Sequence, residues 1–251
     1  MSKTIKIKYH MYDIFEDILE SSLSLDFVAF NLETVFKNAD RKAVYYSCPA
    51  WAHKAKRTYV VRSPVDISLR IIFAEDGSNE ARIETPNLDQ VKFDRWITPT
   101  FDVDGWCRKE KVTLQFNIPK CLFWTNEKNI WIEQSPYPLT AVRNNIVSLH
   151  GWYNLSSWTR GVSFAMDVVD YRKPIVIKRG DPLYQISFFS ENLDDEYKLV
   201  KEEPSVDLLR QVRKRVRAKN YIGRSVHEEQ MFKKQTSKCP FDFLWKKEED
   251  F

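Results

Sequence analysis

The four histidines are the first residues to examine for chemistry, because imidazole is a common metal ligand and general base. They stand at His10, His53, His150 and His227, far apart in the chain, and none belongs to a His-Glu-x-x-His motif. Metal-dependent oxygen chemistry needs two imidazoles and a carboxylate that converge on one ion. The spacing therefore predicts no metal centre.

The motifs of nucleophilic hydrolysis and of phosphate binding are absent as well. The chain has no Gly-x-Ser-x-Gly elbow and no Gly-x-x-x-x-Gly-Lys loop, and it has only 6 glycines. The carboxylate pairs Asp102 and Asp104, and Asp194 and Asp195, lie in polar, turn-like sequence. We expect these carboxylates in solvated loops, and we expect no cofactor.

The segment PIVIKRGDPLYQISFF is the most strongly patterned in the chain. Two apolar strands flank a turn in which Gly180 permits an unusual backbone conformation and Pro182 fixes the conformation that follows. The segment resembles the terminal hairpin of dUTPases and dCTP deaminases, with Gly180, Gln185 and Phe188 in matching positions. The upstream aspartate hairpin and the serine- and arginine-containing loop of those enzymes have no counterpart in the expected form. A closing β-hairpin is the simpler interpretation.

Tryptophans cluster in the middle of the chain, interleaved with charged residues. Aromatic rings beside a few polar groups can line a ligand pocket or stack on nucleobases, and they can equally fill the core of a sheet. The candidate pocket residues are Trp124, Trp131, Glu133, Trp152, Trp158, Arg160 and Gln185.

The C-terminal segment carries the positive charge of the protein. Residues 205–251 contain 12 Lys and Arg against 7 Asp and Glu, whereas the preceding residues contain 27 against 28. The pattern predicts a helix after an N-cap at Ser205, with Val206, Leu209, Val212 and Val216 on one apolar stripe and Gly223 as a stop. Its basic residues are Arg210, Arg213, Lys214, Arg215, Arg217, Lys219 and Arg224. Such a helix suits nucleic-acid phosphates or an acidic protein surface, and a solvated face with ion pairs is an alternative interpretation.

The elements that must position these residues are mainly strands. The opening KTIKIKYH alternates, and extended sequence is expected from Val44 to Phe73, including YYSCPAW. Strands then follow at short intervals, with Pro, Asn or Gly between them, up to PLYQISFF. A short amphipathic helix is expected within Asp13 to Phe36. The sequence predicts a mainly β domain over residues 1–200, an antiparallel sandwich or barrel-like core, followed by a basic helical arm and an aromatic, charged tail over residues 201–251.

Composition limits the class of protein. The chain has 251 residues, 43% hydrophobic and 29% charged, with 14% aromatic residues and 8 tryptophans. These values are typical of a globular protein with a large core, and scarce glycine disfavours a nucleotide enzyme. The four cysteines are widely spaced and the N-terminus does not read as a signal peptide, so we expect reduced thiols and no secretion.

Several motifs together resemble a family of proteins of unknown function from T4-like marine phages, cyanophages included, and from some bacteria. They are CPAW from Cys48, SPVDISL from Ser63, FNIPKCLFWTNEKNIWIEQSP from Phe116 and the stretch from Gly151 to Phe189. The resemblance covers about residues 44–190 and implies a phage origin and a β-rich fold. It implies no activity.

A binding or structural module is therefore the leading functional hypothesis. The β core and the basic arm would contact a virion or host protein, with nucleic acid as a second possible partner, in the host cytoplasm or the virion and not at a membrane. A homo-oligomer is a further possibility. The alternative is a nucleotide-handling enzyme with a dUTPase-like hairpin.

Overall fold

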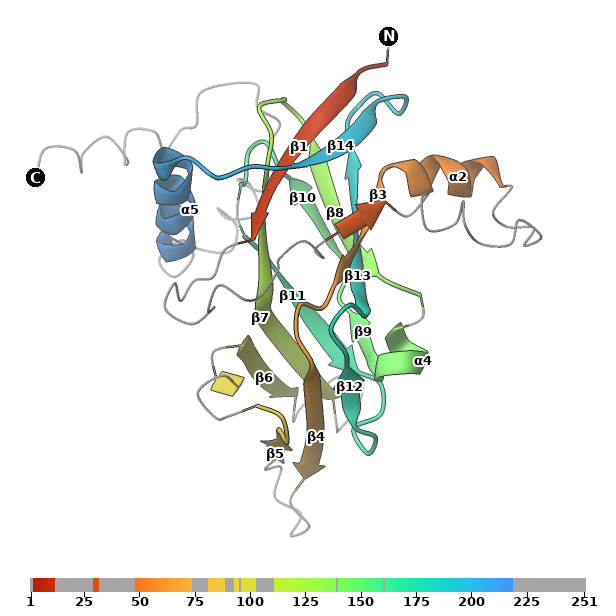
Figure 1. Ribbon diagram of the computed structural model, residues 1–251, viewed down its shortest axis with the longest axis vertical. Coiled ribbons are helices and arrows are strands. Elements are labelled where there is room, and N and C mark those ends of the chain that lie inside the picture. The colour runs from red at the N-terminus through yellow and green to blue at the C-terminus, as the bar shows by residue number, and fades with distance from the viewer. Residues whose placement is uncertain are drawn as a thin grey trace, which may run out of the picture.

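The computed structural model describes residues 2–11, 29–31, 48–73, 81–88, 93–94, 96–102, 111–138, 140–159 and 161–218. Strands dominate these ranges, as the sequence predicts, and they form three sheets (Figure 1). Among these residues no helix is both long and apolar enough to span a membrane.

The first sheet has the order β14-β1-β7-β11-β9, and β6 also pairs with β7. Its strands are β1 (Thr4–Met11), β6 (Ile97–Asp102), β7 (Lys111–Trp124), β9 (Ile146–Ser148), β11 (Gly161–Val168) and β14 (Glu196–Lys201). β1 and β14 pair in parallel, and the other pairings are antiparallel.

The second sheet has the order β10-β8-β13-β3-β2, and all of its pairings are antiparallel. Its strands are β2 (Ala29–Asn31), β3 (Thr58–Arg62), β8 (Trp131–Pro136), β10 (Gly151–Asn154) and β13 (Pro182–Phe189). A smaller sheet contains β4 (Ile67–Phe73), β5 (Ala81–Glu84) and β12 (Ile175–Ile177). The helices are α2 (Pro49–Lys56), α4 (Thr140–Asn144) and α5 (Val206–Ala218).

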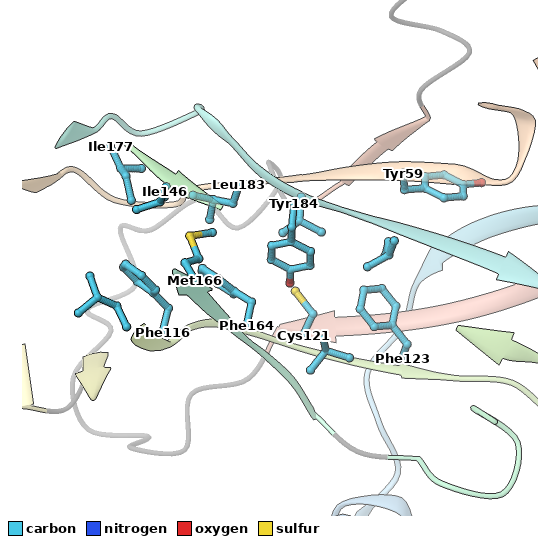
Figure 2. Close-up of a cluster of buried hydrophobic side chains, with 14 of the residues drawn as sticks. Tyr59, Phe116, Cys121, Phe123, Ile146, Phe164, Met166, Ile177, Leu183 and Tyr184 are labelled. Atoms are coloured by element: carbon cyan, nitrogen blue, oxygen red, sulfur yellow. The ribbon is translucent and has the colours of Figure 1, made fainter. Parts of the chain in front are cut away.

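One buried hydrophobic cluster joins the three sheets. Alternate residues of β1, β11 and other strands point into it, because side chains along a strand alternate between its two faces. Phe116 stacks on Phe164 with ring centroids 5.1 Å apart, and Phe164 contacts Tyr184 at 4.8 Å. Figure 2 shows the Tyr184 ring pointing across the cluster toward Cys121. Burial raises the pKa of the Cys121 thiol to about 12.

Several expectations need correction. The solvated position expected for Asp195 is wrong, because this residue is 5% exposed and accepts hydrogen bonds from the Lys3 backbone N–H and from Ser190. The barrel-like alternative is wrong, because the described strands form separate sheets that do not close into a barrel. The extended structure expected through YYSCPAW is wrong from Pro49 onward, where α2 begins. Proline fits the first turn of a helix, the alanines favour helix, and His53, Lys54 and Lys56 lie in the last turn, where the helix dipole favours positive charge. The strand expected at VKFDRWI also fails, since Phe93, Asp94 and Trp96 are helical.

Other expectations fall largely outside the described residues. The helix expected within Asp13 to Phe36 falls mostly on residues outside the described ranges, and the short strand β2 lies in that span. The part of the arm and tail beyond Ala218 also lies outside the described residues. The domain boundary near residue 200 stays a prediction. Cys48 and Cys121 are free cysteines, the first exposed and the second buried.

Candidate binding surfaces

The candidate residues divide between two outer faces, one on each large sheet. On β7 of the first sheet, Cys121 and Phe123 point into the main core, so Leu122 and Trp124 point to the opposite, outer face. On β8 of the second sheet, Ile132 points into the same core, so Trp131 and Glu133 point outward on that sheet. α5 and α2 lie on opposite sides of the molecule in Figure 1.

α5 packs on the outer face of the first sheet at the end of β7. Leu208, Leu209 and Val212 pack against Leu122 and Trp124 in a separate hydrophobic cluster. Val212 is only 2% exposed, because it lies at the centre of this contact. The helix therefore has a fixed apolar side, which holds its remaining sides in a defined orientation.

Polar contacts hold α5 at both ends of the segment that packs on the first sheet. The Leu208 backbone N–H donates to Ser205 Oγ at 3.2 Å, the N-cap bond that the sequence predicts. One turn beyond Val212, the Arg215 guanidinium lies 5.7 Å from the Trp158 ring centroid and donates to the Thr159 carbonyl oxygen at 3.1 Å. Arg215 is thus an anchor of the helix and not part of its outward charge.

The exposed side of α5 combines an apolar hollow with positive charge. The hollow has a volume of about 520 Å³, and among the described residues it is lined by Val206, Leu209, Arg210, Arg213 and Lys214. Val206 is 73% exposed, contrary to the expectation that it joins the packed stripe. Leu208 contacts the sheet instead, because it lies four residues before Val212 on the same helix face.

The outer face of the second sheet carries an aromatic cluster, which we define as Trp131, Trp152 and Phe189. The ring centroids of Trp131 and Trp152 are 5.4 Å apart, those of Trp152 and Phe189 are 6.2 Å apart, and those of Trp131 and Phe189 are 6.4 Å apart. A single stack would separate its outer rings by about twice the inner distance, so these rings form a compact triangle. Trp152 lies on β10 at the end of the sheet and is 54% exposed.

Glu133 lies beside this cluster, with partners on two sides. Its cross-strand neighbours are Trp152 on β10 and Ser187 on β13. Its Oε1 is 2.8 Å from His150 Nε2, and its Oε2 accepts from Lys54 Nζ of α2 at 3.3 Å. The lysine compensates the carboxylate charge, so the surface beside the rings is polar without a strong net charge.

α2 packs on another part of this outer face, at β3. Its Ala55 packs on Val60 of β3, with Trp51 and Tyr137 beside them. Gln185 is the cross-strand neighbour of Val60 and is 8% exposed. The helix thus leaves the aromatic cluster uncovered while it encloses the part of the sheet that contains Gln185.

The turn expected at Gly180 joins β12 to β13, but the closing β-hairpin is wrong, because β12 pairs with β4 whereas β13 pairs with β3 and β8 in another sheet. Gly180 has a φ of 90°, in the region that favours glycine, and no atom lies within 4 Å of the position that a Cβ would take. Asp181 Oδ2 accepts the Lys178 backbone N–H at 2.9 Å and the Asn144 side-chain amide at 3.1 Å. Pro182 then begins β13. These contacts give the turn a structural role.

The proposed pocket residues thus occupy three places. Trp131, Glu133 and Trp152 come together on the second sheet, and Gln185 is enclosed on the same face nearer α2. Trp124 lies beneath α5 on the first sheet, and Trp158 lies beside α5 in the turn between β10 and β11. Arg160, Lys219 and Arg224 lie outside the described residues, as does the side chain of Arg217.

Several contributors were not found from the sequence. Lys54 and His150 both contact Glu133, and Phe189 completes the aromatic cluster. Phe189 ends a strand that the sequence does predict, but its neighbours depend on strand register. Within the described ranges, no group of three or more His, Cys, Asp or Glu side chains is arranged to hold a metal ion.

Comparisons with known proteins do not show a family for this chain. No protein-family model matches the chain, and no curated protein matches it. One similar solved structure is a point mutant of the dUTPase from phage phi11 of S. aureus, with 9% sequence identity, coverage of 62% of this chain and 86% of the other, and a TM-score of 0.31. A likeness this low supports no functional argument. The resemblance to the phage family stays a prediction.

Proposed function

We propose that this protein is a binding module that holds an acidic segment of a partner protein against the exposed side of α5. The observation that carries the proposal is the hollow in which Val206 and Leu209 stand among Arg210, Arg213 and Lys214. In the setting that the phage resemblance implies, the partner is a virion or host protein. The sandwich-like core serves as the rigid support.

The mixed lining favours a protein segment over nucleic acid. Nucleic-acid backbones are bound chiefly by cations and hydrogen-bond donors directed at phosphates. Here a 73% exposed valine stands beside the cations, and an apolar side chain of a peptide can bury it while neighbouring carboxylates meet the net positive charge of this side of α5. Arg210 also donates to Asp207 of the same helix at 3.0 Å, which leaves two of the three cations of the hollow in excess over the carboxylate. A protein partner thus uses both parts of the surface.

The attachment of α5 also supports binding. Because the N-cap, the Leu122 and Trp124 contact and the Arg215 anchor already fix the helix, little helix ordering remains to oppose association. The nucleotide-handling enzyme stays an untested alternative with no geometric observation in its favour. The structure separates Trp152 from Trp158, two residues of the pocket that the alternative would use.

The test is a fluorescence anisotropy titration of the full chain with two labelled probes. One probe is a short amphipathic peptide with Leu and Glu on opposite faces, and the other is single-stranded DNA of similar length. We expect saturable peptide binding that weakens with added salt, because exposed charges are screened. Val206→Ser should weaken peptide binding about threefold, through lost apolar contact.

The matched control is Lys178→Glu, a charge reversal at an exposed lysine outside α5. It should leave peptide affinity within about twofold of the wild type, whereas Arg213→Glu should weaken it about tenfold or more. Binding of DNA with no peptide binding would overturn the proposal, as would peptide binding that Arg213→Glu leaves unchanged.

A further inference from the structure

The aromatic cluster of Trp131, Trp152 and Phe189 is a second surface, on the sheet face opposite α5, and it plays no part in the proposed function. Trp152 is 54% exposed, whereas Trp124 is 7% and Trp158 is 4% exposed. An aromatic side chain this exposed leaves a large apolar area in contact with solvent. The chemistry around the ring indicates what it could bind.

The surface is too small for a stable protein partner. In the connection that precedes β10, Leu149 is the other large apolar residue that is exposed, at 41%. Stable protein interfaces bury about 800 Å² on each partner and contain a cluster of apolar anchors. A single exposed indole with a polar edge matches a small ligand with one flat apolar face.

The charges beside the ring disfavour a strongly ionic ligand. Lys54 Nζ lies 3.3 Å from Glu133 Oε2 and compensates the carboxylate, so neither a cation nor a phosphate meets an unbalanced opposite charge. The same groups offer neutral ligands good hydrogen-bond partners. Glu133 accepts, Lys54 donates, and the 60% exposed His150 side chain can do either.

We propose that this surface is a binding site for a neutral saccharide. One face of a pyranose ring presents C–H groups with slight positive charge, which suit the negative face of the Trp152 indole. The hydroxyl groups at the sugar's edge then reach Glu133 and His150, whose side chains stand beside the ring. Trp131 and Phe189 hold the indole in place through their ring contacts and exclude water from its inner side.

The experiment is saturation-transfer NMR of the full chain with three probes: cellohexaose, maltohexaose and chitohexaose. We expect at least one of them to receive saturation at its ring C–H protons, with a dissociation constant of about 0.1–1 mM, as suits one exposed ring. Trp152→Ala should weaken that binding at least about tenfold, and Trp152→Phe, which keeps an aromatic face, should restore much of it.

Two controls make the result specific. Val142→Ala removes an 85% exposed apolar side chain away from the cluster and should leave saccharide binding unchanged. Adenosine monophosphate, added as a fourth probe, tests stacking of a nucleobase. The inference is overturned if none of the three saccharides binds, if binding survives Trp152→Ala, or if the nucleotide binds through Trp152 more tightly than the saccharides. None of these outcomes bears on α5.

Discussion

The two outer faces of this protein use the same residue type in opposite ways. On the first sheet, Trp124 is buried beneath α5, and the buried Trp158, in the turn between β10 and β11, lies 5.7 Å from the Arg215 guanidinium of that helix. On the second sheet, α2 stops short of the edge, and Trp152 is left exposed beside Glu133. A tryptophan therefore indicates core or surface here according to whether a helix covers its strand, and not according to its place in the sequence.

The largest expected effect comes from Trp124→Ala. Truncating this buried ring should leave a cavity under α5 and lower the free energy of unfolding by about 3–5 kcal/mol. Urea denaturation monitored by far-UV circular dichroism measures the change. A loss below about 1 kcal/mol would mean that α5 does not pack on this face as described.

A smaller effect is expected from Ser205→Ala. The substitution removes the acceptor of the Leu208 N–H at the start of α5, and it should cost about 1 kcal/mol. The same urea denaturation measures the loss. Ser205→Asp is the matched comparison, since aspartate also caps helices and should restore stability. A loss of the same size in both variants would show that the cap bond is not its cause.

Acid should destabilise the edge of the first sheet through Asp195. Burial alone would raise the pKa of this carboxyl, but hydrogen bonds from Ser190, the Lys3 backbone N–H and Asn192, together with the Lys3 charge, lower it below its ordinary value. The folded protein therefore holds the proton less tightly than the unfolded chain. The resulting stability is present above the unfolded pKa and is lost as pH falls through the folded pKa.

Asp195→Asn checks this assignment. Urea denaturation at a series of pH values from neutral to acid should show a shallower loss of stability in the variant than in the wild type. Parallel curves would show that the Asp195 charge contributes nothing to the acid response. The hydrogen bond from the Lys3 backbone N–H to Asp195, at the start of β14, would then not depend on that charge for its stability.

The smallest effect is expected from Trp152→Ala. Because this ring is 54% exposed and packs on Trp131 and Phe189, its loss should lower the free energy of unfolding by no more than about 1 kcal/mol. Measured beside Trp124→Ala, it gives the sharpest form of the comparison between the faces. Equal losses for the two variants would remove the distinction.

The sequence predicts most of the strands, because alternation marks β1, β8, β11 and β13 clearly. It does not predict which face a tryptophan takes. Trp124 and Trp131 are seven residues apart, yet the chain crosses from the first sheet to the second between them, and that crossing depends on long-range pairing. In the α5 stripe, Leu209 and Val212 are predicted correctly, Val206 is misplaced, and the side chain of Val216 lies outside the described residues. Helical periodicity alone does not say where the contact with the sheet begins.

The candidate surfaces are predictable only in part, for a similar reason. Glu133, Trp131 and Trp152 can be named from their neighbourhood in the chain. Their partners Lys54 and Phe189 come from α2 and from the end of β13, and only strand register and helix placement bring them together. The Cys48-Pro49 step suggests extended chain, whereas the alanines after it favour the helix that carries Lys54.

A charge-exchange titration tests the binding role of α5 most directly. The wild type and Arg213→Glu are each titrated with the Leu and Glu peptide and with a peptide in which lysines replace the glutamates. We predict that Arg213→Glu loses affinity for the acidic peptide about tenfold and gains affinity for the basic one, because the charge at this position faces the bound segment. Equal affinity of wild type and variant for both peptides would contradict the proposal that α5 binds an acidic partner segment.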